Sequence, residues 1–238
     1  MADILDVYKP VAYDESVSHF EIHSYLPYNT SRFGINDEIR MAIQHQQLNV
    51  LPCQSSLHIS GKICKSSKET EAPTSTALVN NAILHLFEQI RYELNGIEID
   101  RSKRVGLTST MKGWVSHSPT QTEFLQNAGW IDLLETKRII NDAEYFDVNI
   151  PLKLFLGFAE DYQKIIINCR HELILTRANS DDGAVHQTGT AEGVTFKLEN
   201  IEWLMPHVQL STDYKIRMLR QLERQKSIKI AFRSWELY

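Results

Sequence analysis

The sequence predicts an all-β protein: an antiparallel sandwich with short inserted helices and a C-terminal helix. About eight segments alternate apolar and polar residues, with the two-residue period of strands that are buried on one face. Asn, Gly and Pro residues lie between these segments, as they do in antiparallel sandwiches. The jelly roll is one common form of such a sandwich. The chain has neither a repeat of fixed length nor a regular strand–helix rhythm, so a parallel sheet is not expected.

The firmest local signal is a hairpin over residues 86–100. Its first strand carries apolar residues mainly at even offsets: Leu86, Ile90, Tyr92 and Leu94. Asn95-Gly96 then supplies the positive φ angles that a tight primed turn needs, and residues 97–100 return as the second strand. The apolar run at residues 78–83 is too short to distinguish a helix from a strand.

Three strands are predicted before the hairpin, at residues 16–28, 37–45 and 55–65. The clearest pattern places Ile39, Met41 and Ile43 on one face of the second strand. Residues 1–15 lack periodicity, and we expect an N-terminal arm there. Residues 66–75 are polar with one proline, which predicts a mobile surface loop.

After the hairpin, residues 101–130 predict two short helices inserted between strands. Leu107, Met111 and Trp114 recur at spacings of four and three, and Ser118-Pro119 is typical of a cap followed by proline at the first helical position. Residues 144–149 resume the strand pattern. Residues 151–158 are apolar and compact, which predicts a short helix or a turn.

The longest strand is expected at residues 164–177, about 45 Å long at ~3.3 Å per residue. The more solvent-exposed face of this strand is expected to carry the polar residues Asn168, Arg170 and Glu172. The chain then predicts a polar loop at residues 179–192, a strand at 194–204, a helix from Ser211 or Thr212 to about residue 225, and a strand from residue 227.

Composition narrows the classes of function. The chain has 238 residues, a formal net charge of −5 and a pI near 6.0, so no global positive field attracts nucleic acid. The first residues do not resemble a secretory signal, and no apolar run approaches the roughly 18 to 20 residues of a membrane span. The chain has an odd number of cysteines, and they are widely spaced: Cys53, Cys64 and Cys169. This pattern favours reduced thiols over disulfide bonds. We expect an intracellular protein that is not secreted.

One pattern is conceivable as a metal cluster. His19, Glu21 and His23 alternate on one face of the first predicted strand. Same-face neighbours on a strand lie roughly 7 Å apart, so a solvated strand face is the favoured interpretation. His58 and His171 lack the paired H-x-H and following glutamate of jelly-roll cupin enzymes.

The other candidate sites also favour structural interpretations. The chain has no G-x-S-x-G motif and no glycine-rich phosphate loop, and its cysteines lie in or near strand-like segments, where inert thiols are usual. Asp181-Asp182-Gly183 is more typical of a turn than of a calcium site. A basic helix face, more often solvated than bound to nucleic acid or membrane, comprises Lys215, Arg217, Arg220, Arg224 and Lys226. We expect no catalytic, cofactor-binding or metal site.

The chain resembles the double jelly-roll major capsid proteins of Polinton/Maverick elements and virophage-like viruses, including copies in animal genomes. Three stretches carry the resemblance: LVNNAILHLFEQIRYELNGIEIDRSKRVGLTSTMKG (residues 78–113), IPLKLFLGFAEDYQKIIINCRHELILTR (residues 150–177) and FRSWELY (residues 232–238). The likeness extends from about residue 14 to the end and contains no catalytic motif. It implies a structural, non-catalytic protein that self-associates as a trimer or higher oligomer, contacts other capsid proteins and resides in the virion of an active element.

Proteins of this family carry two eight-stranded jelly rolls in tandem, and three copies form a pseudo-hexagonal capsomer. This chain has room for only the first roll. The resemblance implies an arm at residues 1–15, a jelly-roll domain at 16–210 and, at 211–238, a helix plus strand that connects towards a missing second roll. It also implies that Asn95-Gly96 turns at a sandwich end and that residues 151–158 form a short helix at its edge.

Two alternatives remain at the level of sequence. A lectin-like binding module would expose aromatic residues on loops such as 29–34 or 179–193, although the latter has no Phe, Tyr or Trp. A cupin-type metalloenzyme would contain stoichiometric metal. None of these three interpretations predicts a specific nucleic-acid partner. The capsid interpretation also predicts no small-molecule substrate.

Overall fold

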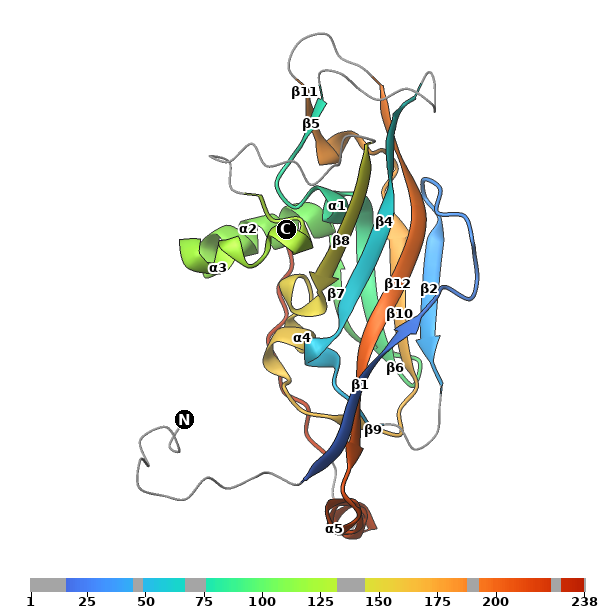
Figure 1. Cartoon of the computed structure of the whole chain (residues 1–238), viewed down its shortest axis with the longest axis vertical. Helices are drawn as coiled ribbons and strands as arrows, with labels where there is room; N and C mark the ends of the chain where they lie inside the picture. Colours follow the sequence, from blue (N-terminus) through green and yellow to red (C-terminus); the bar gives the residue numbers. More distant parts are fainter. Residues whose placement is uncertain are drawn as a thin grey trace.

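The computed structural model describes residues 16–44, 49–66, 76–131, 144–187, 193–223 and 228–237. In this part of the chain, two main antiparallel sheets face each other, with most helices along one side and the last helix at one end (Figure 1). The antiparallel sandwich predicted from the sequence is confirmed.

The first sheet is built around the long strand β12 (Val194–Leu210). β1 (Val17–Tyr25) and β4 (Ser56–Lys65) lie on opposite sides of β12, because Trp203 of β12 pairs with Tyr25 of β1 and with Leu57 of β4. β8 (Tyr145–Pro151) pairs with β4, while the short strands β3 (Asn49–Val50) and β9 (Ile166–Ile167) extend the sheet beside the end of β12.

The second sheet has the order β2 (Glu38–Ile43), β10 (His171–Arg177), β6 (Phe87–Leu94) and β7 (Ile97–Lys103). The predicted hairpin is confirmed as β6 and β7, and Asn95 and Gly96 have φ angles of 52° and 79°. A separate ribbon pairs β5 (Thr76–Leu78) with β11 (Val185–Gln187).

The hairpin is the centre of a nested pairing scheme. Among the described residues, β6 pairs with β7, β4 with β8, β2 with β10 and β1 with β12, so each pair encloses the previous one in sequence. The pairs β4–β12 and β6–β10 join them into two sheets. This is the connectivity of a long hairpin rolled into a sandwich, the jelly roll.

The core lies between the two sheets. Alternation along β8, and along β4 from Leu57 to Ile63, buries every second residue, as the sequence pattern predicts. Trp203 is the largest fully buried side chain, and its ring meets Tyr92 of the opposite sheet edge-on, with 6.0 Å between centroids. Burying each large apolar side chain contributes about 1.5–3 kcal/mol. β1 differs from the other long strands, because its residues from Val17 to Ser24 are all exposed.

The helices occupy the connections between strands. Within the described residues they are α1 (Ala82–His85), α2 (Val105–Ser116), α3 (Pro119–Glu123), α4 (Gly157–Asp161) and α5 (Thr212–Glu223), with 3₁₀ turns at Pro52–Gln54, Gln126–Ala128, Leu152–Leu154 and Asp182–Ala184. Both helices predicted after residue 101 are present, and the Gln121 side chain accepts a hydrogen bond from the backbone N–H of Ser118 at 3.0 Å. The short helix predicted at residues 151–158 and the C-terminal helix are also confirmed.

The single long strand predicted at residues 164–177 is wrong. Asn168 has a φ of 50°, which interrupts the extended chain and sends β9 into the first sheet and β10 into the second. The longest described strand is instead β12, which continues six residues beyond the predicted end at residue 204. Glu172 was expected on a solvent-exposed face, but it is buried, with only 5% of its surface exposed.

Two further expectations need correction. The polar loop expected at residues 179–192 contains a 3₁₀ turn and strand β11, and its residue Asp181 is buried. Residues 228–237, expected to begin a strand, have no strand pairing. The expected arm at residues 1–15 and most of the loop at 66–75 lie outside the described residues.

Candidate functional site

The histidine and carboxylate residues of β1 meet on one exposed face of the strand. Glu21 Oε1 lies 2.7 Å from His23 Nε2, and Glu21 Oε2 lies 3.3 Å from His19 Nε2. Hydrogen bonds from His23 and then His19 lower the pKa of Glu21. The three side chains are 45–59% exposed. In the described ranges, no group of three His, Cys, Asp or Glu residues is arranged to hold a metal ion.

His207 of β12 extends this cluster. Its ring stacks on His23 with 4.2 Å between centroids, and Tyr25 Oη lies 2.8 Å from its Nε2. Partial burial raises the pKa of Tyr25. The sequence does not indicate His207 as a neighbour, because its pairing with Glu21 depends on strands more than 180 residues apart.

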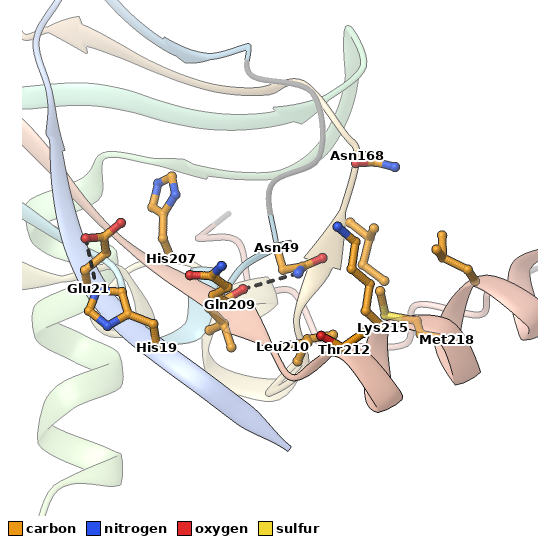
Figure 2. A pocket seen from close by; sticks show the side chains of 13 residues that line it. His19, Glu21, Asn49, Asn168, His207, Gln209, Leu210, Thr212, Lys215 and Met218 are labelled. Atoms are coloured by element: carbon orange, nitrogen blue, oxygen red, sulfur yellow. Dashed lines mark hydrogen bonds and ion pairs between the residues drawn. The ribbon is translucent and has the colours of Figure 1, made fainter. Parts of the chain in front are cut away.

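A groove of about 750 Å³ adjoins the cluster. Figure 2 shows His19 and Glu21 on one side and Lys215 and Met218 of α5 on the other, with Gln209 between them. The lining mixes apolar side chains with hydrogen-bond donors and acceptors. It combines the Lys215 cation and the Glu21 carboxylate with amides and imidazoles.

The three cysteines, Cys53, Cys64 and Cys169, are free thiols, and Cys64 is buried. Burial raises the pKa of the Cys53 thiol, which disfavours the reactive thiolate at neutral pH.

Asp181, considered as a calcium ligand, belongs to a buried ion pair. Asp181 Oδ1 accepts a hydrogen bond from Arg177 Nη2 at 2.8 Å, and Oδ2 accepts one from the backbone N–H of Phe196, also at 2.8 Å. Arg177 Nη1 donates to the carbonyl oxygen of Leu86 at 2.8 Å. Both carboxylate oxygens therefore have protein partners, and the pair joins β10 to β12 and to the start of β6.

Residues 228–237, which we call the C-terminal segment, cross α4 and β7. Arg233 forms a two-pronged ion pair with Asp161, at 2.7 and 2.9 Å, and hydrogen bonds to Arg233 lower the pKa of Asp161 to about 2. Ser234 Oγ donates to buried Asp100 at 2.8 Å, and Lys112 Nζ of α2 lies 4.4 Å from the centre of the Trp235 ring. The C-terminal segment therefore contacts α4, β7 and α2 through three successive residues.

Gly157 is where the C-terminal segment approaches α4 most closely. A Cβ atom there would lie 1.9 Å from the carbonyl oxygen of Arg233 and 2.9 Å from the Trp235 ring. We expect Gly157→Ala to displace the segment, seen as faster amide hydrogen exchange in residues 228–237. Gly183→Ala is the matched control, since its Cβ would meet nothing closer than 3.8 Å. Equal exchange in both variants would contradict the close contact.

The basic face predicted on α5 is exposed where it is described. Lys215, Arg217 and Arg220 are all exposed, while Arg224 and Lys226 lie outside the described residues. Among the helices that the structure describes, none has the length and apolar character needed to cross a bilayer.

Comparison with known proteins identifies the same architecture. A family model described as a double jelly roll-like domain matches residues 76–238. No curated protein matches the chain. The structure of VP54 from PBCV-1, fitted into a reconstruction of the virophage Sputnik, is similar with a TM-score of 0.51 and 12% identity, over 88% of this chain and 46% of that one.

Two other solved structures have the same fold. The Sputnik virophage structure has a TM-score of 0.50 and 9% identity, over 87% of this chain and 51% of that one. The Faustovirus major capsid protein has a TM-score of 0.50 and 10% identity, over 90% of this chain and 58% of that one. The chain therefore spans about half the length of these structures. Because the family model covers more than half of the sequence, the chain belongs to the family of double jelly roll-like domains.

Proposed function

We propose that this chain is the N-terminal jelly roll of a double jelly-roll capsid protein and acts structurally, without catalysis, by self-association. One observation carries the proposal: a complete set of nested strand pairs, among the described residues, lies in a chain that covers 58% of a viral major capsid protein with the same fold. Its site of action is the virion or the cell that assembles it.

The proposed domain organisation follows from this role. Residues 1–15 form an arm, residues 16–210 form the jelly roll, and residues 211–238 lead towards a second roll. The contacts of the C-terminal segment with α4 and β7 support a fixed path for this connection. An open reading frame that continues past the codon for Tyr238 into a second strand-rich region is expected.

Self-association is tested by size-exclusion chromatography with light scattering, followed by electron microscopy of the largest species. We expect the mass to rise with concentration from the 27.5 kDa monomer towards a trimer or larger assembly. A mass that stays at the monomer value over a wide range of concentration would contradict the proposal.

A further inference from the structure

Strand β1 is held to the molecule mainly through β12. Within the described ranges, β12 is its one hydrogen-bonded strand partner, and the residues of β1 from Val17 to Ser24 are all exposed. A strand that buries little apolar surface opens locally at a low cost in free energy. Among the long strands described, β1 is therefore the one that a local change in charge can detach most readily.

The side chains of β1 cover His207 of β12. The His207 ring stacks on that of His23 with 4.2 Å between centroids, and Tyr25 Oη lies 2.8 Å from His207 Nε2. His207 is only 7% exposed, although it lines the groove beside Glu21 and His19 (Figure 2). Separation of the two strands would therefore bring the His207 imidazole into water.

At neutral pH the charges around His207 are balanced. Of the described residues that line the groove, Glu21 is the one carboxylate, and Lys215 is the one cation other than the imidazoles. Glu21 lies directly opposite His207 in the strand pairing. Its carboxylate oxygens already lie 2.7 Å from His23 Nε2 and 3.3 Å from His19 Nε2. A proton added to any of these imidazoles therefore gives the cluster a net positive charge.

The other titratable groups near His207 keep their charge state in mildly acidic solution. Partial burial raises the pKa of Tyr25, so its hydroxyl stays protonated. Burial, and then the nearby His207, lower the pKa of His171 of β10 to about 4, so this imidazole is neutral at pH 5.5. Where they are described, β3 and β9 line the groove with uncharged side chains. A change of charge near pH 6 therefore falls on the imidazoles of β1 and β12.

Protonation makes the contact between the two strands repulsive. Imidazole is the side chain that ordinarily changes charge between pH 5 and 8. Glu21, His19 and His23 all lie on β1, so their mutual attraction persists when the strand leaves β12. The repulsion between His23 and His207, and the cost of burying a charge on His207, are instead relieved by separation.

We propose that β1 is an acid-released strand, which leaves β12 when His207 and His23 become protonated, while the rest of the sandwich stays folded. The open state binds more protons than the closed state, so it becomes more favourable as the pH falls. Release leaves one edge of β12 unpaired at residues 203–210, where an extended chain can pair. The device is built into a single copy and does not depend on the proposed self-association.

Amide hydrogen exchange of the full chain tests the release, at a concentration at which the protein is monomeric. Each rate is divided by the intrinsic rate at the same pH. If opening takes up one proton, the opening constant rises about tenfold for each pH unit below about 6.5. We therefore expect the β1 amides to exchange about tenfold faster at pH 5.5 than at pH 6.5. An unchanged β1 rate would overturn the inference.

Low concentrations of urea distinguish local release from global unfolding. Local opening exposes little surface, so exchange in β1 should be faster than in β6 and nearly independent of urea, whereas exchange in β6 should accelerate with urea. If β1 and β6 exchange at the same rate with the same dependence on urea, the strand opens only when the whole chain unfolds. That result would also overturn the inference.

Three histidine variants test the assigned groups. His207→Gln removes the covered imidazole and should abolish the rise between pH 6.5 and 5.5. His23→Gln removes the stacked ring and should leave a smaller rise. Because the His23 side chain is 45% exposed, this variant tests the proposal even if His207→Gln fails to fold. His58→Gln is the control, because this histidine of β4 contacts Asp147 of β8, and it should keep the full rise. The wild-type rise in either His207→Gln or His23→Gln would overturn the inference.

Discussion

Replacement of Asp181 by alanine is expected to lower the free energy of unfolding by about 3–5 kcal/mol. The side chains of Arg177 and Asp181 are 1% and 2% exposed, so the substitution leaves a buried guanidinium without its counter-charge. It also removes the acceptor for the backbone N–H of Phe196. Urea unfolding followed by circular dichroism measures the effect.

Asp182→Ala is the matched control for this experiment. Asp182 is adjacent in sequence but exposed, so its replacement should change the free energy of unfolding by less than about 0.5 kcal/mol. Arg177→Met combined with Asp181→Leu removes both charges and should recover part of the loss. Equal stability of the Asp181 and Asp182 variants would contradict the buried ion pair.

Acidification from pH 6.5 to about 4 is expected to remove about 3 kcal/mol of stability through His171. Burial first, and then the nearby His207, lower the pKa of His171 to about 4. The unfolded chain takes up this proton near pH 6.5, whereas the folded protein does so only near pH 4. Between these values the unfolded state binds more protons, so stability falls as the pH falls.

The His171 contribution is measured by urea unfolding at a series of pH values in this window. His171→Gln removes the titrating group and should flatten the dependence, whereas His186→Gln, at an exposed histidine, should leave it unchanged. Asp161, with a pKa of about 2, loses its ion pair mainly below this window. Identical pH profiles for wild type and His171→Gln would contradict the burial of a neutral imidazole.

Local signals in the sequence predicted the hairpin, the helices and most of the long strands, but they did not predict which strands pair. Asn95-Gly96 specifies its turn through backbone conformation, and alternation specifies which side of β4 is buried. The nested order depends on pairings such as Ser24 with Leu204, which no local pattern encodes. The split of residues 164–177 into two strands has one local signal, because asparagine tolerates the positive φ that Asn168 adopts.

The candidate surfaces were less predictable than the strands. The spacing of Leu107, Met111 and Trp114 predicts a helix, but their exposure depends on Gly106 and Gly113 packing against rings from other elements. Likewise, the Asp181-Asp182-Gly183 sequence is typical of an exposed turn, whereas Asp181 is buried because Arg177 of β10 reaches it. In both cases tertiary contacts decide which side of a local element faces inward.

In the part of the chain that the structure describes, the first strand, β1, pairs with the last, β12, around the nested pairs β2–β10, β4–β8 and β6–β7. Amide–amide nuclear Overhauser effects in deuterated protein test it most directly. The fold predicts cross-strand contacts between β1 and β12, including those around Ser24 and Leu204 and around Glu21 and His207. Contacts that instead pair β1 with β2, its neighbour in sequence, would indicate a simple meander and contradict the jelly roll.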